Sequence, residues 1–590
     1  MAKQSILARF LKWRIRTIPT KQFILILSAV IGFCVGFAAF LIKKAVFLAK
    51  WVLTSSFSEE YSNYLYIIYP LIGILLAVLF IKLILRQHVG HGIPSVLYAI
   101  SKSNGLIKAH NMFSSILTSA VTVGFGGSVG LEGPTVATGA AIGSNLGRML
   151  HLNYKQIILM LGCASAGAMA AIFKAPVAAI VFAIEVIMLD LTLASIVPLL
   201  ISSVCAALTA YMLMGQNVLY VIEVHDKFRM TDIHWFIILG IFTGLISVYF
   251  FRMYMFVHNI FEKIDKWTKK VIIGGLILGV LLYFFPSLYG EGYEVINDAL
   301  HGKYQYLYNN SIFYDLSDNI VAIFALFFVV LLLKVIAMST TFGAGGIGGI
   351  FAPSLFLGSN AGLFFAKVCN YLGTDISERN FALVGMAGLI AGVIHAPLTA
   401  IFLIAEITGG YQLFMPLMIV ATVSYAIIRI FEKNSVYTFQ LAKRGELMTH
   451  DKDKNVLKMM NVTSLIETNF LVIRPDQSLR ELVDVIARST RNVFPVIDDE
   501  EHFVGVVFLD HIRHIMFRQE MYDEVFVRDL YYVPAYMVDP DDSMEEVAEK
   551  FQASGNFNLV VVKDGKYLGF VSRANVFSSY RRMLKHFSED

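Results

Sequence analysis

Three glycine-rich turns that end in proline carry the strongest chemical signal in this sequence. They read Gly90-His-Gly-Ile-Pro94, Gly130-Leu-Glu-Gly-Pro134 and Gly349-Ile-Phe-Ala-Pro353. Proline suits the first turn of a helix, which needs no N–H donor from it, and glycine lets a backbone approach closely. A helix that starts on such a turn offers free N–H groups and about half a unit of positive charge to an anion. Each turn alone could be a kink or a packing turn, but together they predict an anion site.

A single carboxylate, Glu132, lies inside the second turn. An ionised carboxylate can imitate a bound anion at a helix N-terminus. The alternative is a structural salt bridge, but Glu132 has no obvious basic partner nearby in the sequence. We therefore expect Glu132 to lie where the helix starts meet.

An internal repeat defines the elements that must position these turns. Ala175-Pro176 is followed ten positions later by Glu185, and Ala396-Pro397 is followed in the same way by Glu406. The second copy comes 221 positions after the first, and the prolines of the two later glycine turns are 219 positions apart. Two halves with corresponding broken apolar segments are typical of a transporter whose site lies between the halves.

The composition places most of the chain in a membrane. Of its 590 residues, 57% are hydrophobic and only 16% are charged, whereas soluble domains have about 25% charged residues. Many apolar segments are interrupted by Gly or Pro, which predicts tilted, paired or half-spanning helices. The first apolar run, at Phe23, follows a segment with basic and no acidic residues, namely Lys3, Arg9, Lys12, Arg14, Arg16 and Lys21. The positive-inside rule then places the N-terminus in the cytosol, and a cleaved signal peptide is the competing interpretation.

Several function classes find no support in the sequence. The net charge of +4 is small and does not indicate nucleic-acid binding. The cysteines lie in apolar segments without metal-ligand spacing and predict no disulfide framework: Cys34, Cys163, Cys205 and Cys369. The sequence has no Ser-His-Asp arrangement, no P-loop and no metal-binding cluster, so we expect no enzyme activity.

The composition changes near Leu441, and the tail carries a second repeat. Arg474-Pro-Asp-Gln-Ser478 recurs 65 positions later as Asp539-Pro-Asp-Asp-Ser543. Each copy precedes a helical stretch and two predicted strands, at 493–497 and 504–508 in the first copy and at 559–562 and 568–571 in the second. The tail therefore reads as a tandem of two small α/β units.

These motifs resemble those of the CLC family of chloride channels and chloride/proton antiporters. Gly90–Pro94 is similar to the family's G-S-G-I-P, Gly130–Pro134 to G-K/R-E-G-P, and Gly349–Pro353 to G-x-F-x-P. The resemblance covers about Phe23 to Leu441, and the tail resembles a pair of CBS domains. It implies a homodimer with a separate anion pathway in each subunit.

The resemblance also implies roles for individual residues. Glu132 would be the gating glutamate, which fills an anion site when ionised and opens the path when protonated or swung aside. Tyr437, 31 positions after Glu406, falls where the family places its anion-binding tyrosine; the alternative is an interface anchor at a helix end. The remaining anion-binding positions are His91, Gly92, Ile93, Gly130, Gly133, Ile350 and Phe351.

Three residues depart from the family pattern. His91 replaces serine and could make anion affinity depend on pH, unless it is a neutral histidine turned to a backbone partner. Val186, after Glu185, replaces the inner proton-transfer glutamate, which favours a channel or a weakly coupled carrier. Glu185 or Asp190 could serve as another proton relay, or Glu185 could be a buried structural acid. Leu131 replaces a basic residue beside the gate, where Lys174 could supply charge unless it is a solvated lysine at a helix end.

The CBS pair departs from the family's nucleotide-binding pattern as well. The second unit keeps Ser572 but has Asn575 in place of aspartate, and in the first unit Phe508 and His511 change both positions. Adenine-nucleotide binding is therefore doubtful, and a structural or dimerising role is an equal alternative.

We expect an all-α membrane domain of two inverted halves with broken helices, followed by an α/β CBS pair. The expected parts are a basic N-terminal segment (1–22), an anion-transport domain (23–441), a linker (442–455) and two CBS domains (456–520 and 521–590). The expected function is passage of chloride or a similar monovalent anion, channel-like or weakly proton-coupled. A chloride/proton antiporter, a membrane-anchored sensor with a vestigial pore and a carrier of organic solutes remain alternatives. We expect a bacterial-type inner membrane, with both termini in the cytoplasm.

Overall fold

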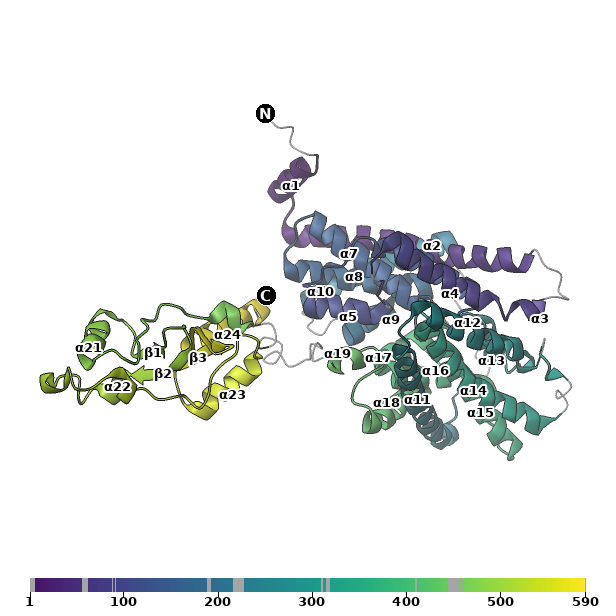
Figure 1. Ribbon diagram of the computed structural model, residues 1–590. Coiled ribbons are helices and arrows are strands. Elements are labelled where there is room, and N and C mark those ends of the chain that lie inside the picture. Colours follow the sequence, from purple (N-terminus) through teal and green to yellow (C-terminus); the bar gives the residue numbers. More distant parts are fainter. Residues whose placement is uncertain are drawn as a thin grey trace. The chain divides into compact units, whose positions relative to one another are not determined.

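The computed structural model describes residues 6–55, 62–87, 89–90, 92–187, 193–215, 228–308, 311–314, 319–408, 411–443, 457 and 460–588. The chain divides into two compact units, Met1–Leu447 and Met448–Asp590. Figure 1 shows the first unit as an assembly of helices and the second as a mixture of helices and short strands. This confirms the predicted fold class, an all-α membrane domain followed by an α/β pair.

The helices of the first unit are of very unequal length, from long spans to short broken segments. Two short π-helical segments, η2 (Phe80–Leu85) and η3 (Ala183–Ile187), extend α4 and α9. The helices are α1 Ile6–Thr17, α2 Thr20–Ser55, α3 Ser62–Leu65, α4 Tyr69–Leu79, α5 Gly92–Lys102, α6 Asn111–Gly124, α7 Glu132–Met149, α8 Tyr154–Phe173, α9 Pro176–Phe182, α10 Leu193–Met214, α11 Ile233–Glu262, α12 Trp267–Phe284, α13 Tyr293–Leu300, α14 Ile320–Gly343, α15 Phe351–Tyr371, α16 Glu378–Ile394, α17 Pro397–Ile407, α18 Phe414–Phe431 and α19 Phe439–Lys443.

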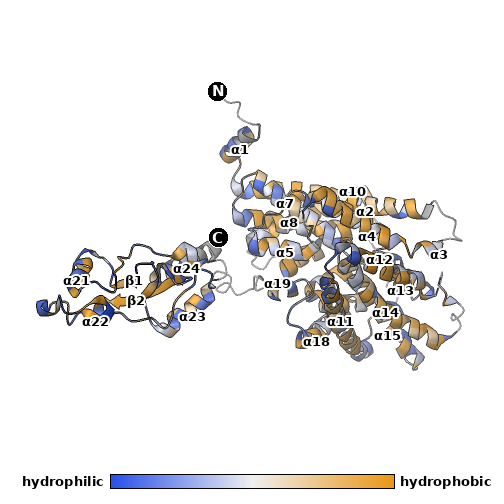
Figure 2. Ribbon diagram, in the orientation of Figure 1, coloured by the Kyte–Doolittle hydropathy of each residue, from blue (hydrophilic) through white to orange (hydrophobic). Residues whose placement is uncertain are grey.

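The first unit is apolar on its outside as well as in its core. Within the described residues, seven helical segments are long and apolar enough to cross a bilayer. Large apolar side chains such as Phe33, Phe47 and Met212 are exposed on these helices, and Figure 2 shows hydrophobic residues along most of the unit. A soluble protein would cover such side chains with its own chain, so lipid is the expected neighbour.

Close helix packing repeats in the two halves and explains the spacing of their glycines. A Cβ on Gly143 of α7 would lie 2.5 Å from the Met160 carbonyl of α8. A Cβ on Gly362 of α15 would lie 2.0 Å from the Phe381 carbonyl of α16. Glycine four residues earlier in each pair is also closely packed, because a Cβ on Gly139 would lie 2.7 Å from the Ala164 carbonyl and one on Gly358 would lie 2.4 Å from Met386 Cα. These are the small residues that allow helices to associate closely inside a membrane, and they keep the 219-residue offset.

Hydrogen bonds between equivalent residues show that the two halves are inverted. Gly130 and Gly349, which are 219 positions apart, form an antiparallel bridge with N–H···O distances of 2.8 and 2.7 Å. Each glycine donates its N–H to the carbonyl of the other, so a local two-fold axis relates the two turns. The predicted inverted repeat is therefore confirmed at the level of backbone contacts.

The second unit contains two two-stranded antiparallel sheets, one in each CBS-type unit. Its main elements are α21 Leu479–Arg488, β1 Val493–Ile497, β2 Phe503–Phe508, α22 Leu509–Ile512, α23 Met544–Ser554, β3 Asn558–Lys563, β4 Lys566–Ser572 and α24 Arg573–Ser588. Ser478 and Ser543, the repeated serines of the sequence motif, each form a capping box at the start of α21 and α23. The predicted strands are confirmed, and each observed strand begins and ends within two residues of its expected bounds.

Candidate anion-binding site

The three glycine turns meet at backbone contact. A Cβ on Gly92, at the start of α5, would lie 2.9 Å from Gly133 Cα at the start of α7. A Cβ on Gly133 would lie 3.1 Å from Gly349 Cα, just before α15. Any side chain at these positions would push the helix starts apart, and Gly92 also has φ of +52°, which favours glycine. Glycine is therefore required at these positions, because the three helix N-termini lie in backbone contact.

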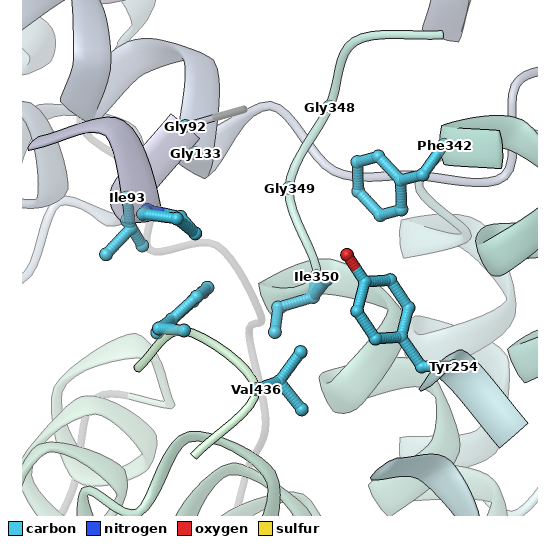
Figure 3. A pocket seen from close by; sticks show the side chains of 11 residues that line it. Gly92, Ile93, Gly133, Tyr254, Phe342, Gly348, Gly349, Ile350 and Val436 are labelled. Carbon is cyan, nitrogen blue, oxygen red and sulfur yellow. The ribbon is translucent and has the colours of Figure 1, made fainter. Parts of the chain in front are cut away.

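The converging turns enclose a cavity without charged side chains among its described lining residues. The α5 turn contributes Gly92, Ile93 and Pro94, and the other lining residues are Gly133, Tyr254, Phe342, Gly348, Gly349, Ile350, Val436 and Tyr437. Figure 3 shows the chain from Gly348 to Ile350 crossing beside the cavity, with the ring of Tyr254 close to Ile350. Because the first N–H groups of a helix have no partner within the helix, the positive field here comes from backbone ends.

Tyr437 is the most informative side chain in the lining. The residue is 4% exposed, and its hydroxyl has no hydrogen-bond partner among the described residues. A buried hydroxyl without a partner costs about 1–3 kcal/mol. Such a group is expected where a ligand supplies the missing bond. The structure thus brings Tyr437 to the cavity, as the sequence predicts.

Glu132 is fully buried at the first position of α7, and the two halves of its carboxylate differ. Its Oε1 accepts a hydrogen bond of 2.6 Å from the hydroxyl of Tyr293. Its Oε2 has no hydrogen-bond partner among the described residues and lies over Gly130, where a Cβ would approach it to 2.0 Å. The carboxylate therefore lies next to the bridge between the two halves, as expected for a charge that imitates an anion.

The other predicted site residues divide into those at the cavity and those behind it. Gly130 holds the bridge to Gly349 and does not line the cavity. Phe351 is the first residue of α15, and its buried ring contacts Phe173 and Phe182 at centroid distances of 5.3 and 6.5 Å. His91 lies outside the described residues, so its proposed pH effect stays a prediction.

Glu185 of the first half of the repeat caps a helix of the second half, and Glu406 of the second half caps a helix of the first. Glu185 accepts from the backbone N–H groups of Leu398 and Thr399, at 3.1 and 2.8 Å, and from the Thr399 hydroxyl at 2.7 Å, all at the start of α17. Glu406 accepts from the N–H groups of Val177 and Ala178, at 3.1 and 2.7 Å, at the start of α9. Each Ala-Pro segment therefore starts a helix that is capped by the glutamate of the other half.

The sequence named Val186, Asp190 and Lys174 beside Glu132 or on the expected inner proton path. Val186 is half-buried in η3 and packs against the core, while Asp190 lies outside the described residues. Lys174 ends α8 and donates to the carbonyl of Gly215 at 2.8 Å. This bond holds the lysine at a helix end, which was one of the two alternatives that the sequence left open.

Two residues near the start of α7 were missed by sequence reasoning. Tyr293 holds Glu132, although 161 positions separate them. Lys334 is fully buried in α14 and donates to Ser128 Oγ at 2.8 Å and to two backbone carbonyls at 3.2 and 3.3 Å. Lys334 gave a signal, because it is the one charged residue in the apolar run from 320 to 343. Tyr293 gave none, because nothing in its local sequence indicates a distant partner.

In the CBS pair, the two residues predicted to bind a nucleotide form hydrogen bonds within the protein. The Ser572 hydroxyl donates to Glu467 Oε1 at 2.6 Å, and Arg491 binds the other oxygen of Glu467 at 2.8 Å. Asn575 donates through its backbone N–H to Ser572 Oγ at 3.1 Å. The carboxylate of Glu467 thus lies against the hydroxyl of Ser572.

Comparisons with known proteins agree with this geometry. The profile of the family described as "Voltage gated chloride channel" matches residues 72–429, and the CBS domain profile matches residues 462–518 and 527–582. The chain is 29% identical over 384 residues to a "Putative chloride channel protein ClcB-like" of Ralstonia nicotianae, covering 64% of this chain and 85% of that protein. It is 28% identical over 453 residues to an "H(+)/Cl(-) exchange transporter ClcA" of Vibrio parahaemolyticus, covering 73% and 92%.

Solved structures share the fold. A slow cyanobacterial Cl⁻/H⁺ antiporter superposes with a TM-score of 0.61 at 23% identity, covering 72% of this chain and 99% of that one. A eukaryotic CLC transporter superposes with a TM-score of 0.61 at 18% identity, covering 97% and 99%. With the family profile spanning more than half of its residues, the chain belongs to the voltage gated chloride channel (CLC) family and carries a C-terminal pair of CBS domains.

Proposed function

We propose that this membrane protein passes chloride or a similar monovalent anion through the cavity between the starts of α5, α7 and α15. The observation that carries the proposal is the convergence of three helix N-termini on a cavity that also holds the hydroxyl of Tyr437, for which the described part of the chain offers no hydrogen-bond partner. Partial charges attract an anion without binding it as tightly as a full cation would, so the anion can leave again. The backbone N–H groups of Ile93, Ile350 and Phe351 are the proposed donors.

Glu132 is the proposed gate of this path. When ionised, its carboxylate competes with an anion for the space beside Gly130 and Gly349. When protonated, it loses its attraction for the helix N-termini and can swing aside. Lowering the pH on the side of the membrane from which Glu132 is protonated should therefore open the path.

The proposed transport mode is channel-like or weakly proton-coupled. Val186 cannot carry a proton, and the carboxylate of Glu185 is engaged by three donors at the start of α17. These bonds support a structural role for Glu185, as the cap of α17, over the role of a proton relay. Chloride/proton exchange is the second candidate, favoured by the match to a relative named as an exchange transporter.

We further propose a homodimer in a bacterial inner membrane, with both termini in the cytoplasm. The basic residues of α1, Arg9, Lys12, Arg14 and Arg16, support this orientation through the positive-inside rule. The CBS pair has a structural or dimerising role in this proposal, which is supported by the hydrogen bond from Ser572 to Glu467 and by the pairing of Glu467 with Arg491.

Reconstitution into liposomes with chloride and pH electrodes tests the proposal. The parent should release chloride with little or no proton movement, faster at acidic external pH. Glu132→Gln mimics the protonated gate, so its chloride flux should be high and independent of pH. A Glu132→Gln variant that keeps the parent's pH profile would contradict the gating role, and a fixed chloride-to-proton ratio in the parent would establish exchange.

A further inference from the structure

A second tyrosine, Tyr254 of α11, lines the same cavity as Tyr437. It belongs to none of the three glycine turns and precedes Tyr437 by 183 positions. Figure 3 shows its hydroxyl directed toward the chain that runs from Gly349 to Ile350. This hydroxyl forms no hydrogen bond with any residue in the described part of the chain. The cavity therefore has a second hydroxyl with a donor to offer.

Two contacts between α11 and α19 bring both tyrosines to one cavity. The ring of Phe251 meets the ring of Phe439 edge to face, with centroids 5.2 Å apart. One helical turn beyond Tyr254, His258 Nε2 lies 3.1 Å from Gln440 Nε2. Positions 251, 254 and 258 are three and four residues apart, so they share one face of α11. Because α19 begins two residues after the second tyrosine, these contacts fix α11 beside that tyrosine.

Aromatic neighbours on two sides fix the ring of Tyr254. The ring of Phe342, which also lines the cavity, lies edge to face with it at a centroid distance of 6.1 Å and an angle of 88°. The imidazole of His258 stacks on it at 6.2 Å and 14°. A phenylalanine at position 254 would keep both contacts. The hydroxyl contributes to neither of them, so packing of the ring does not explain its presence.

The size and chemistry of the cavity suit a small anion that accepts both hydroxyl donors. Its volume is about 30 Å³, whereas one water molecule needs about 10–15 Å³. Its described lining residues carry no charged side chain, and each tyrosine hydroxyl supplies one O–H donor. Hydrogen bonds to an ionised acceptor are roughly twice as strong as those between neutral groups. An anion is thus the ligand that gains most from a second hydroxyl here.

We propose that Tyr254 donates a hydrogen bond to the anion in this cavity and is its second side-chain ligand beside Tyr437. The inference rests on the proposed anion site and adds a determinant of its specificity. A site built from hydrogen-bond donors rejects a ligand that leaves those donors poorly paired. Two hydroxyls should therefore favour chloride over iodide, which is a weaker hydrogen-bond acceptor.

Calorimetric titration of the purified full chain with chloride and with iodide tests the role of Tyr254. Tyr254→Phe should lower chloride affinity by about tenfold or more. Iodide affinity should fall less, so the ratio of chloride to iodide affinity should fall as well. Tyr249→Phe is the matched control, because Tyr249 lies on the same helix and its hydroxyl donates to the carbonyl of Leu332 at 2.9 Å. This control should bind both anions as the parent does.

The outcomes separate this inference from the proposed anion site. Unchanged affinities in Tyr254→Phe, with weaker chloride binding in Tyr437→Phe, would overturn the role of Tyr254 and leave the site intact. Affinities that change in neither variant would overturn the site itself. If Tyr254→Phe does not fold, crystals of the parent grown with bromide decide the question. An anomalous peak within hydrogen-bond distance of the Tyr254 hydroxyl supports the inference, and a cavity peak beyond that distance overturns it.

Discussion

Tyr437→Phe is the most discriminating single substitution for the anion site. The hydroxyl it removes has no hydrogen-bond partner among the described residues, so the change breaks none of the hydrogen bonds observed there. What it removes is one proposed bond to the anion. A hydrogen bond to a charged group contributes about 1.5–3 kcal/mol, which corresponds to an affinity lower by about 10- to 150-fold.

The effect of the same substitution on stability should depend on whether the anion is present. In chloride-free buffer the variant no longer buries an unpaired hydroxyl and should be more stable by about 1–3 kcal/mol. In chloride the parent gains more binding free energy, so the difference should shrink or reverse. Calorimetric titration of chloride, with thermal unfolding in chloride-free and chloride-containing buffer, measures both effects.

Tyr249→Phe is the matched control. Its hydroxyl donates to the carbonyl of Leu332 at 2.9 Å, and Tyr249 is not among the residues that line the cavity. Its loss should lower stability by about 1 kcal/mol and leave chloride affinity unchanged. Equal chloride affinities of Tyr437→Phe and the parent would refute the reasoning.

Further predictions concern the caps, the buried lysine and the CBS pair. Glu185→Ala and Glu406→Ala should each lower stability by about 1–3 kcal/mol in chemical unfolding, because each removes a helix cap of the opposite half, and neither should alter anion selectivity in flux assays. Lys334→Met should cost about 3 kcal/mol, because buried carbonyls lose their donor, and faster hydrogen exchange in the loop before α13 should reveal it. The bidentate Arg480 guanidinium holds the pKa of Asp523 below its ordinary value of 3.8. That stabilisation is present above pH 3.8 and disappears as the pH falls through the lowered pKa, so the stability difference between Asp523→Asn and the parent should vanish in acid.

Much of the site could be predicted because its chemistry is local in the sequence. A glycine turn, a proline and a helix start occupy a few consecutive residues, and the repeat offset relates Gly130 to Gly349 before any contact is known. Tyr437 was found through the family resemblance, since a lone tyrosine has no local signature. The contacts that support the site are different, because they join residues far apart in the chain.

The exchange of caps between the halves illustrates what sequence reasoning lacks. The equivalence of Glu185 and Glu406 is visible in the sequence, but their reciprocal hydrogen bonds depend on an inverted arrangement in three dimensions. Tyr293 is an ordinary tyrosine by sequence and becomes significant only because the fold brings its hydroxyl to Glu132. Burial and partner geometry, which one sequence does not encode locally, decide these roles.

Bromide anomalous scattering tests the central claim most directly. In crystals grown with bromide, the account predicts an anomalous peak in the cavity, within hydrogen-bond distance of the Tyr437 hydroxyl and the backbone N–H of Ile350. A peak beside Lys334 instead, or a cavity without a peak in a protein that still conducts bromide, would contradict the claim that helix N-termini form the anion site.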